Sequence, residues 1–173
     1  HIYGRKPEEQ DLTYHIYDPE IADWSLRGAK PKEMFYAECY YTLIVCGTPK
    51  GTFVWSKDGR VFKYNAEKKE WEPIVLTGLP MPGSSCDGSS LQYDSKRNRL
   101  IAIRTPGWNT KYDGEVYEID LKTLAVRSLS PTGMKALAGM TFVREAAYDS
   151  QNDIFLVAAA IAPEGSSPLQ IPY

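Results

Sequence analysis

The side chains best suited to holding a ligand lie mainly in two short segments rich in aromatic and charged residues. A Trp or Tyr placed among amide, ammonium and carboxylate groups can stack on a sugar ring or anchor a protein partner. We predict a ligand-binding site made of Arg104, Trp108, Lys111, Tyr112 and Asp113 from one segment, Trp55 and Lys57 from the other, and Arg144. The alternative for Trp108 is that its ring folds back and covers the edge of a sheet.

The residue types restrict covalent and metal chemistry. The chain has two histidines, His1 and His15, which are too few for a histidine metal site or for a catalytic triad in the body of the chain. Its three cysteines form no Cys-x-x-Cys pair, which argues against a zinc or dithiol motif. We interpret Cys39 and Cys46 as small apolar residues of strands, and the alternative is one disulfide among Cys39, Cys46 and Cys86 with one thiol left over. We therefore assign no catalytic residue, no metal ligand and no cofactor.

Two Asp-Gly pairs, Asp58-Gly59 and Asp113-Gly114, occur at matching places in the chain. A calcium site is one interpretation of such carboxylates. The simpler one is turn chemistry, because Gly accepts a positive φ at low cost and Asp bonds to its own backbone. We predict a turn at each pair.

Composition and charge narrow the class of protein. The 173 residues are 43% hydrophobic and 24% charged, which is typical of a globular domain, and the net charge of −2 argues against nucleic-acid binding. The longest apolar runs, 40–46 and 155–162, are far too short to span a membrane. The first ten residues are polar, so we expect no signal peptide. A first residue other than Met favours a processed or longer chain and an extracytoplasmic compartment.

An internal repeat is the strongest pattern in the sequence. The segment 58–65 reappears at 113–120, and Tyr93-Asp94-Ser95 reappears as Tyr148-Asp149-Ser150 with the same offset in residue number. Thr77-Gly78 and Thr132-Gly133 are separated by that offset too. A looser earlier copy matches 42–49 to 99–106. A period of about 50 residues or slightly more is typical of propellers and similar arrays.

Each repeat is predicted to hold four antiparallel strands. Residues 60–64 and 115–119 alternate apolar and polar side chains, as in half-buried strands, while 100–103 and 154–157 are short apolar runs typical of buried ones. We expect strands at 89–93, 99–104, 114–120 and 125–129, joined by polar hairpin tips. The sequence therefore predicts an all-β protein built from four-stranded antiparallel sheets.

The pattern resembles kelch-type repeats, a β-propeller group that includes galactose-oxidase-like domains. An apolar strand ending in Tyr148-Asp149 precedes the apolar strand 154–157, and the strand 61–65 is followed by Trp71. Trp24 and Trp71 occupy matched positions, and we expect both to pack between blades. The resemblance implies blades at 31–76 and 87–130, and half blades at 12–26 and 141–160. About three blades' worth is present, against the six to eight expected of the whole ring.

Two origins of the missing blades stay open: further chain from a longer protein, or a second copy of this chain. In a meander, the loops 48–58, 79–88, 104–113 and 132–143 share one face, opposite the tips, and we call this the long-loop face. We expect a non-catalytic scaffold that binds a protein or a glycan there. The alternative is a propeller enzyme, an oxidase or a glycoside hydrolase, with its catalytic residues largely outside this segment.

Overall fold

The computed structural model describes residues 13–29, 44–84, 89–104, 115–131 and 140–161, and within these residues the chain is all-β. Strand formation follows from the short apolar and alternating stretches, which are bounded by Asp, Asn, Gly and Pro. The strands are β1 (Thr13–Asp18), β2 (Asp23–Ala29), β3 (Ile44–Thr48), β4 (Gly51–Trp55), β5 (Val61–Asn65), β6 (Glu70–Pro73), β7 (Thr77–Gly78), β8 (Ser90–Asp94), β9 (Arg99–Ile103), β10 (Val116–Asp120), β11 (Ala125–Leu129), β12 (Met140–Asp149) and β13 (Ile154–Ile161).

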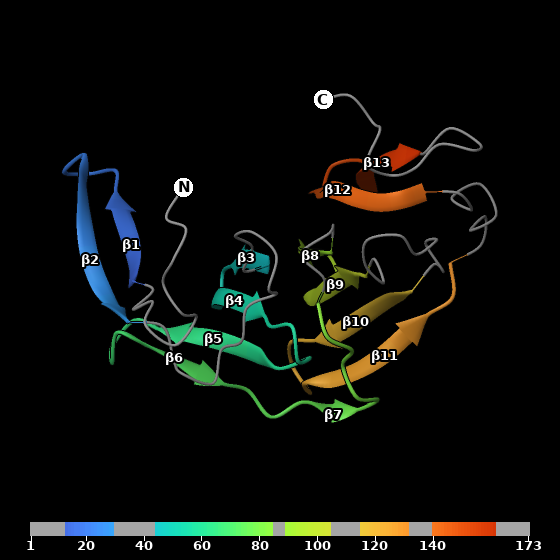
Figure 1. The fold of residues 1–173 in the computed structure, drawn as a ribbon, viewed down its shortest axis with the longest axis horizontal. Helices are drawn as coiled ribbons and strands as arrows, with labels where there is room; N and C mark the ends of the chain where they lie inside the picture. Colours follow the sequence, from blue (N-terminus) through green and yellow to red (C-terminus); the bar gives the residue numbers. More distant parts are fainter. Residues whose placement is uncertain (1–12, 30–43, 85–88, 105–114, 132–139, 162–173) are drawn as a thin grey trace, which may run out of the picture.

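The strands form four sheets in chain order. Strands β3-β4-β5-β6 make a four-stranded antiparallel meander, and β8-β9-β10-β11 make a second one, to which β7 adds in parallel beside β11. Strands β1-β2 and β12-β13 are two-stranded antiparallel hairpins. The sheets follow one another along an arc, with the β1–β2 hairpin at one end and the β12–β13 hairpin at the other (Figure 1). Strand β8 lies beside both β3 and β12, so these three strands form the inner side of the arc.

The period predicted from the sequence is present in the positions of the strands. Strands β5, β6 and β9 begin at residues 61, 70 and 99, and β10, β11 and β13 begin at residues 116, 125 and 154, so each pair has the same offset. Strands β8 and β12 end at Asp94 and Asp149, which are separated by that offset as well. The strands expected at 89–93, 99–104, 114–120 and 125–129 correspond to β8, β9, β10 and β11.

Five hairpins share one type of tip. Each first strand ends in Asp or Asn, four residues follow, and the fourth of these has a φ between 49° and 59°. The residues with positive φ are Ala22, Lys69, Asn98, Leu124 and Asp153. In the tip after β10, the Asp120 carboxylate accepts hydrogen bonds from the backbone N–H groups of Lys122 (2.7 Å) and Thr123 (2.8 Å). Asn65, Asp94 and Asp149 accept equivalent backbone bonds, so a local side-chain bond fixes each of these turns.

Apolar side chains fill the spaces between neighbouring sheets. The largest cluster joins the β3–β6 sheet to the β8–β11 sheet and includes Trp55, Leu100 and Ile119, each wholly buried. A second cluster joins Ile101 and Ile103 of β9 to the β12–β13 hairpin through Ala146. A third lies on the other face of the β3–β6 sheet. Burial of these faces stabilises the arc, because each sheet alone would expose apolar surface.

The earliest repeat copy was predicted in the wrong register. We expected 42–49 to match 99–106 and 48–58 to be a long loop. Instead, β3 occupies the inner position equivalent to β8, and β4 (Gly51–Trp55) crosses the predicted loop. A two-residue turn makes this possible: the Thr48 hydroxyl accepts a bond from the backbone N–H of Lys50 (3.0 Å), and Gly51 has a φ of 118°. The sequence Thr-Pro-Lys-Gly carried that turn signal.

Candidate functional site

The predicted ligand-binding residues have different positions in the structure. Trp108, Lys111, Tyr112 and Asp113 lie outside the described residues. Arg144 belongs to β12, at an irregularity of strand pairing between Val143 and Glu145, and its side chain also lies outside the described part. Trp55, Lys57 and Arg104 are described, and each lies against the segment 82–84: the Trp55 indole bonds to Pro82, the Arg104 guanidinium bonds to Gly83, and the Lys57 carbonyl packs closely on Gly83.

Trp55 is not a loop residue available to a ligand, and that prediction is wrong. It is the last residue of β4, its side chain is wholly buried in the largest core cluster, and its indole Nε1 donates a hydrogen bond to the Pro82 carbonyl (2.9 Å). Burial of a ring this large is worth about 3–5 kcal/mol to stability. Trp71, by contrast, is half-buried and packs beside Val54 and Phe62, with its ring 5.3 Å from that of Tyr64. The side chain of Trp24 lies outside the described residues.

Lys57 lies exposed in the tight turn that joins β4 to β5. The Ser56 carbonyl accepts bonds from the N–H groups of Gly59 (3.0 Å) and Ser84 (3.1 Å), which fixes the turn against the segment 81–84. Gly59 has a φ of 85°, and a Cβ there would meet the Met81 carbonyl oxygen at 2.1 Å. The predicted Asp-Gly turn is therefore confirmed at this position, with Gly required by both conformation and space.

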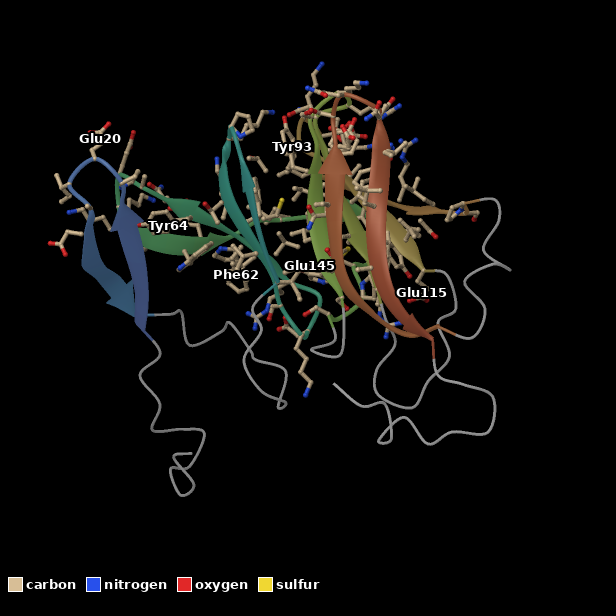
Figure 2. The ribbon with its side chains drawn as sticks, turned by 90° about the horizontal axis from the view of Figure 1, so that it is seen from above. Glu20, Phe62, Tyr64, Tyr93, Glu115 and Glu145 are labelled. Atoms are coloured by element: carbon tan, nitrogen blue, oxygen red, sulfur yellow. The ribbon has the colours of Figure 1, made fainter. Side chains whose placement is uncertain are left out.

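Arg104 closes the base of the segment that carries the other predicted ligand-binding residues. Its backbone N–H donates to the Glu115 carbonyl (3.1 Å), and its guanidinium pairs with the Glu115 carboxylate (2.5 Å). The same guanidinium donates to the Gly83 carbonyl (3.2 Å). Residues 104 and 115 therefore form a closed base for the segment 105–114, tied to the link that precedes β8. Glu115 lies at the end of the sheets opposite the hairpin tips (Figure 2).

A shallow groove of about 340 Å³ runs over the inner strands, and the sequence analysis did not predict it. Strands β3, β8 and β12 and the tips after β8 and β12 supply its walls. Its polar lining comes from Gln92, Tyr93, Ser95, Tyr148 and Ser150. Tyr93 and Tyr148 are the same position in successive repeats, so the repeated Tyr-Asp pair was the signal that could have pointed here.

Two of the groove residues, Cys46 and Tyr148, have raised pKa values and stay protonated at neutral pH. Burial raises the pKa of the Cys46 thiol to about 11, so the nucleophilic thiolate is scarce. Desolvation and the hydrogen bond from its hydroxyl to Asp153 (2.7 Å) raise the pKa of Tyr148 to about 12. The groove offers hydroxyl, amide and aromatic groups that can contact a ligand.

A chain of ion pairs links the hairpin tips beside the groove. Asp94, which is wholly buried, accepts from Arg99 Nε (2.8 Å) and from Arg97 (3.1 Å). Arg97 continues the chain to Asp153 with two parallel bonds of 2.8 Å, joining the β8–β9 tip to the β12–β13 tip. Arg99 also pairs with the buried Glu118, which Arg127 contacts from the next strand.

These contacts determine the charge states in the chain. Burial alone would raise the pKa of Asp94, but the bonds from Arg99 and Arg97 outweigh it and lower that pKa. The bonds from Arg97 and Tyr148 lower the pKa of Asp153. Both carboxylates are therefore ionised and paired at neutral pH, which makes this cluster a structural connection between two sheets.

Within the described ranges, no group of three or more His, Cys, Asp or Glu side chains is placed to hold a metal ion. The same part of the chain contains no helix long and apolar enough to cross a membrane. In the comparisons with known proteins, no family model matches the chain and no curated protein is similar to it.

Proposed function

We propose that the chain is a segment of a kelch-type β-propeller that acts as a non-catalytic scaffold and binds a protein or glycan ligand through its long-loop face. Successive four-stranded meanders, a regular period in the strand positions and three inner strands side by side support the blade arrangement. In this arrangement the rigid sheets hold loops of variable length at one end.

The closed base formed by Arg104 and Glu115 is the observation that carries the ligand-binding proposal. It joins the two ends of the segment with Trp108 and Tyr112 and ties them to Gly83. A loop with a fixed base loses less conformational entropy when it binds than a loop with free ends. The aromatic and charged residues of that segment are the types that dominate binding energy at protein interfaces.

At the groove itself, the protonated state of Cys46 and Tyr148 favours binding over covalent catalysis by these two side chains. Cys46 lacks thiolate character and the Tyr148 hydroxyl is engaged with Asp153. Neither can act as a nucleophile or base near neutral pH without a large change in its surroundings.

A direct test is ligand binding by the Trp108→Ala variant. Immobilised glycans and candidate protein fragments are screened with the native chain, and the dissociation constant of the best ligand is measured by calorimetry. Removal of the indole is expected to weaken binding by about tenfold or more. It is expected to change the free energy of unfolding by less than about 0.5 kcal/mol, since a loop residue contributes little to the core.

Lys122→Ala is the matched control, because Lys122 is exposed in the β10–β11 tip at the opposite end of the molecule. It is expected to leave binding unchanged. The proposal fails if Trp108→Ala destabilises the fold as much as Trp55→Ala, because the indole would then belong to the core. It also fails if both variants bind as tightly as the native chain.

A further inference from the structure

The two terminal hairpins correspond to opposite halves of one sheet. Strands β12 and β13 follow β8 and β9 by one period, so this hairpin is an inner half. Among the described strands, the β1–β2 hairpin comes before the innermost strand of the following sheet, β3, just as β10–β11 comes before β12. Trp24 and Trp71 also lie six residues after Asp18 and Asn65. The β1–β2 hairpin is therefore an outer half.

The β12–β13 hairpin exposes apolar surface that is covered in the equivalent β8–β9 pair. Strand β9 pairs with β8 on one side and with β10 on the other, whereas the described pairing of β13 is with β12 alone. Ile154 and Leu156 of β13 are 46% and 58% exposed. The residue equivalent to Leu156 is Ile101, which is 3% exposed because the next hairpin packs on it. Leu156 therefore lies on the face of the hairpin against which a neighbouring sheet would pack. Within the described residues the outer edge of β13 has no strand beside it, and such an edge is a ready partner for another strand.

We infer that the β12–β13 hairpin is completed by the β1–β2 hairpin of a second copy of this chain, giving a mixed sheet in the order β12-β13-β1-β2. The exchange is reciprocal, so two copies form two mixed sheets in an isologous dimer. Each copy also keeps its two meanders, which brings the dimer to six sheets of propeller type, within the range of closed propellers. This inference rests on the proposed propeller arrangement and does not depend on ligand binding.

The register of the new pairing follows from β9 and β10. Ala102 pairs with Tyr117, and Ile101 pairs with Glu118. In the mixed sheet, β13 takes the place of β9, so Val157 and Leu156 replace Ala102 and Ile101. Strand β1 takes the place of β10 with Asp18 at the position of Asp120, so His15 and Ile16 replace Tyr117 and Glu118. Val157 is then opposite His15, and Leu156 is opposite Ile16. The second pair joins two apolar residues, which favours a strand contact in this register.

Sedimentation of the native chain and cross-linking at this register test the inference. The native chain is expected to sediment as a species of twice the 19.5 kDa of one chain at concentrations up to about 100 μM. A double variant, His15→Cys with Val157→Cys, is expected to give a covalent dimer on mild oxidation, because directly opposed residues satisfy disulfide geometry. His15→Cys with Leu156→Cys is the register control and is expected to give much less, since residue 156 belongs to the other face of β13.

A surface variant measures the strength of the contact. Leu156→Lys is expected to raise the dimer dissociation constant by about tenfold or more, because it places a charge on the apolar face that the neighbouring sheet of the second copy would cover. Val75→Lys is the matched control, since Val75 is 82% exposed and lies between β6 and β7, away from the proposed contact. A native chain that stays monomeric throughout the concentration range overturns the inference. An exclusively intramolecular disulfide overturns it as well, because the two hairpins would then belong to one copy.

Discussion

Asp94 lies at the centre of the ion pairs that connect the β8–β11 sheet to the β12–β13 hairpin. Its buried carboxylate receives Arg99 from its own hairpin and Arg97 from the tip, and Arg97 reaches Asp153 of the next hairpin. The Asp94 carboxylate thus orients two guanidinium groups. Arg99 pairs with Glu118 in the same sheet, and Arg97 pairs with Asp153 in the neighbouring hairpin. Charge-assisted bonds of this kind are stronger than neutral ones.

Replacement of Asp94 by Asn is expected to lower the free energy of unfolding by about 2 kcal/mol at neutral pH. The folded-state pKa of Asp94 lies below its usual value, so its contribution is fully present above the unfolded pKa of about 4. That contribution is lost as the pH falls from about 4 through the folded pKa. The difference between native and variant chains should therefore shrink in acid, as measured by denaturant unfolding. A difference that is equal at neutral pH and at about pH 2.5 would contradict this account.

The hairpin tip is the element that recurs most regularly. The Asp or Asn that ends each first strand accepts backbone hydrogen bonds and so fixes the turn. The fourth residue of the tip has a left-handed conformation, which costs about 1–2 kcal/mol for a non-glycine residue. The present residues at this position are therefore not the most stable choice, because Gly adopts the same conformation without this cost.

Lys69→Gly is accordingly expected to stabilise the chain by about 0.5–1 kcal/mol. Glu67→Gly in the same exposed tip is the matched comparison and should destabilise it, because only the backbone entropy term changes there. Thermal unfolding of both variants tests the opposite signs. If both substitutions destabilise the chain by the same amount, the conformational account of the tip is incorrect.

Sequence reasoning worked where local patterns decide the structure and failed where they do not. Alternation, turn residues and the period predicted β8 to β11 closely and the Asp-Gly turn at Gly59. The turn at Thr48–Gly51 was overlooked, so β4 was taken for a loop and Trp55 for a ligand contact. The pairing of Arg97 with Asp153 joins residues 56 positions apart, and only the packing of two sheets brings them together. Trp108, Lys111, Tyr112 and Asp113 fall in 105–114, outside the described residues, and of Arg144 only the backbone is described.

At the scale of the whole molecule, apolar layers hold successive sheets together, and in the described ranges Arg97 and Lys96 add ion pairs to Asp153 of the neighbouring sheet. The β12–β13 hairpin packs on Ile101 and Ile103 through a smaller cluster than the one between the two meanders. We therefore expect the bonds from Arg97 to Asp153 to contribute more to the docking of this hairpin than an ordinary surface ion pair contributes to stability.

Arg97→Met is expected to loosen the hairpin without unfolding the meanders. Backbone amides of β12 and β13 should exchange with deuterium about two- to fivefold faster, and those of β4 and β5 should be unchanged. Lys68→Met is the control, because Lys68 forms its ion pair with Glu72 inside one sheet. Uniform acceleration over the whole chain by Arg97→Met would mean that the sheets open together rather than one at a time.

The connections between equivalent strands differ in length from one sheet to the next. All five hairpins with an Asp or Asn cap span four residues between their strands, whereas the connection after the second strand of a meander has five residues in one sheet, 56–60, and twelve in the next, 104–115. At the end of the sheets that carries the tips the difference is smaller, since the β3–β4 turn has two residues where the equivalent β8–β9 tip has four. New binding specificities in such a chain can arise at the end opposite the tips by changes of loop length that leave every strand in place.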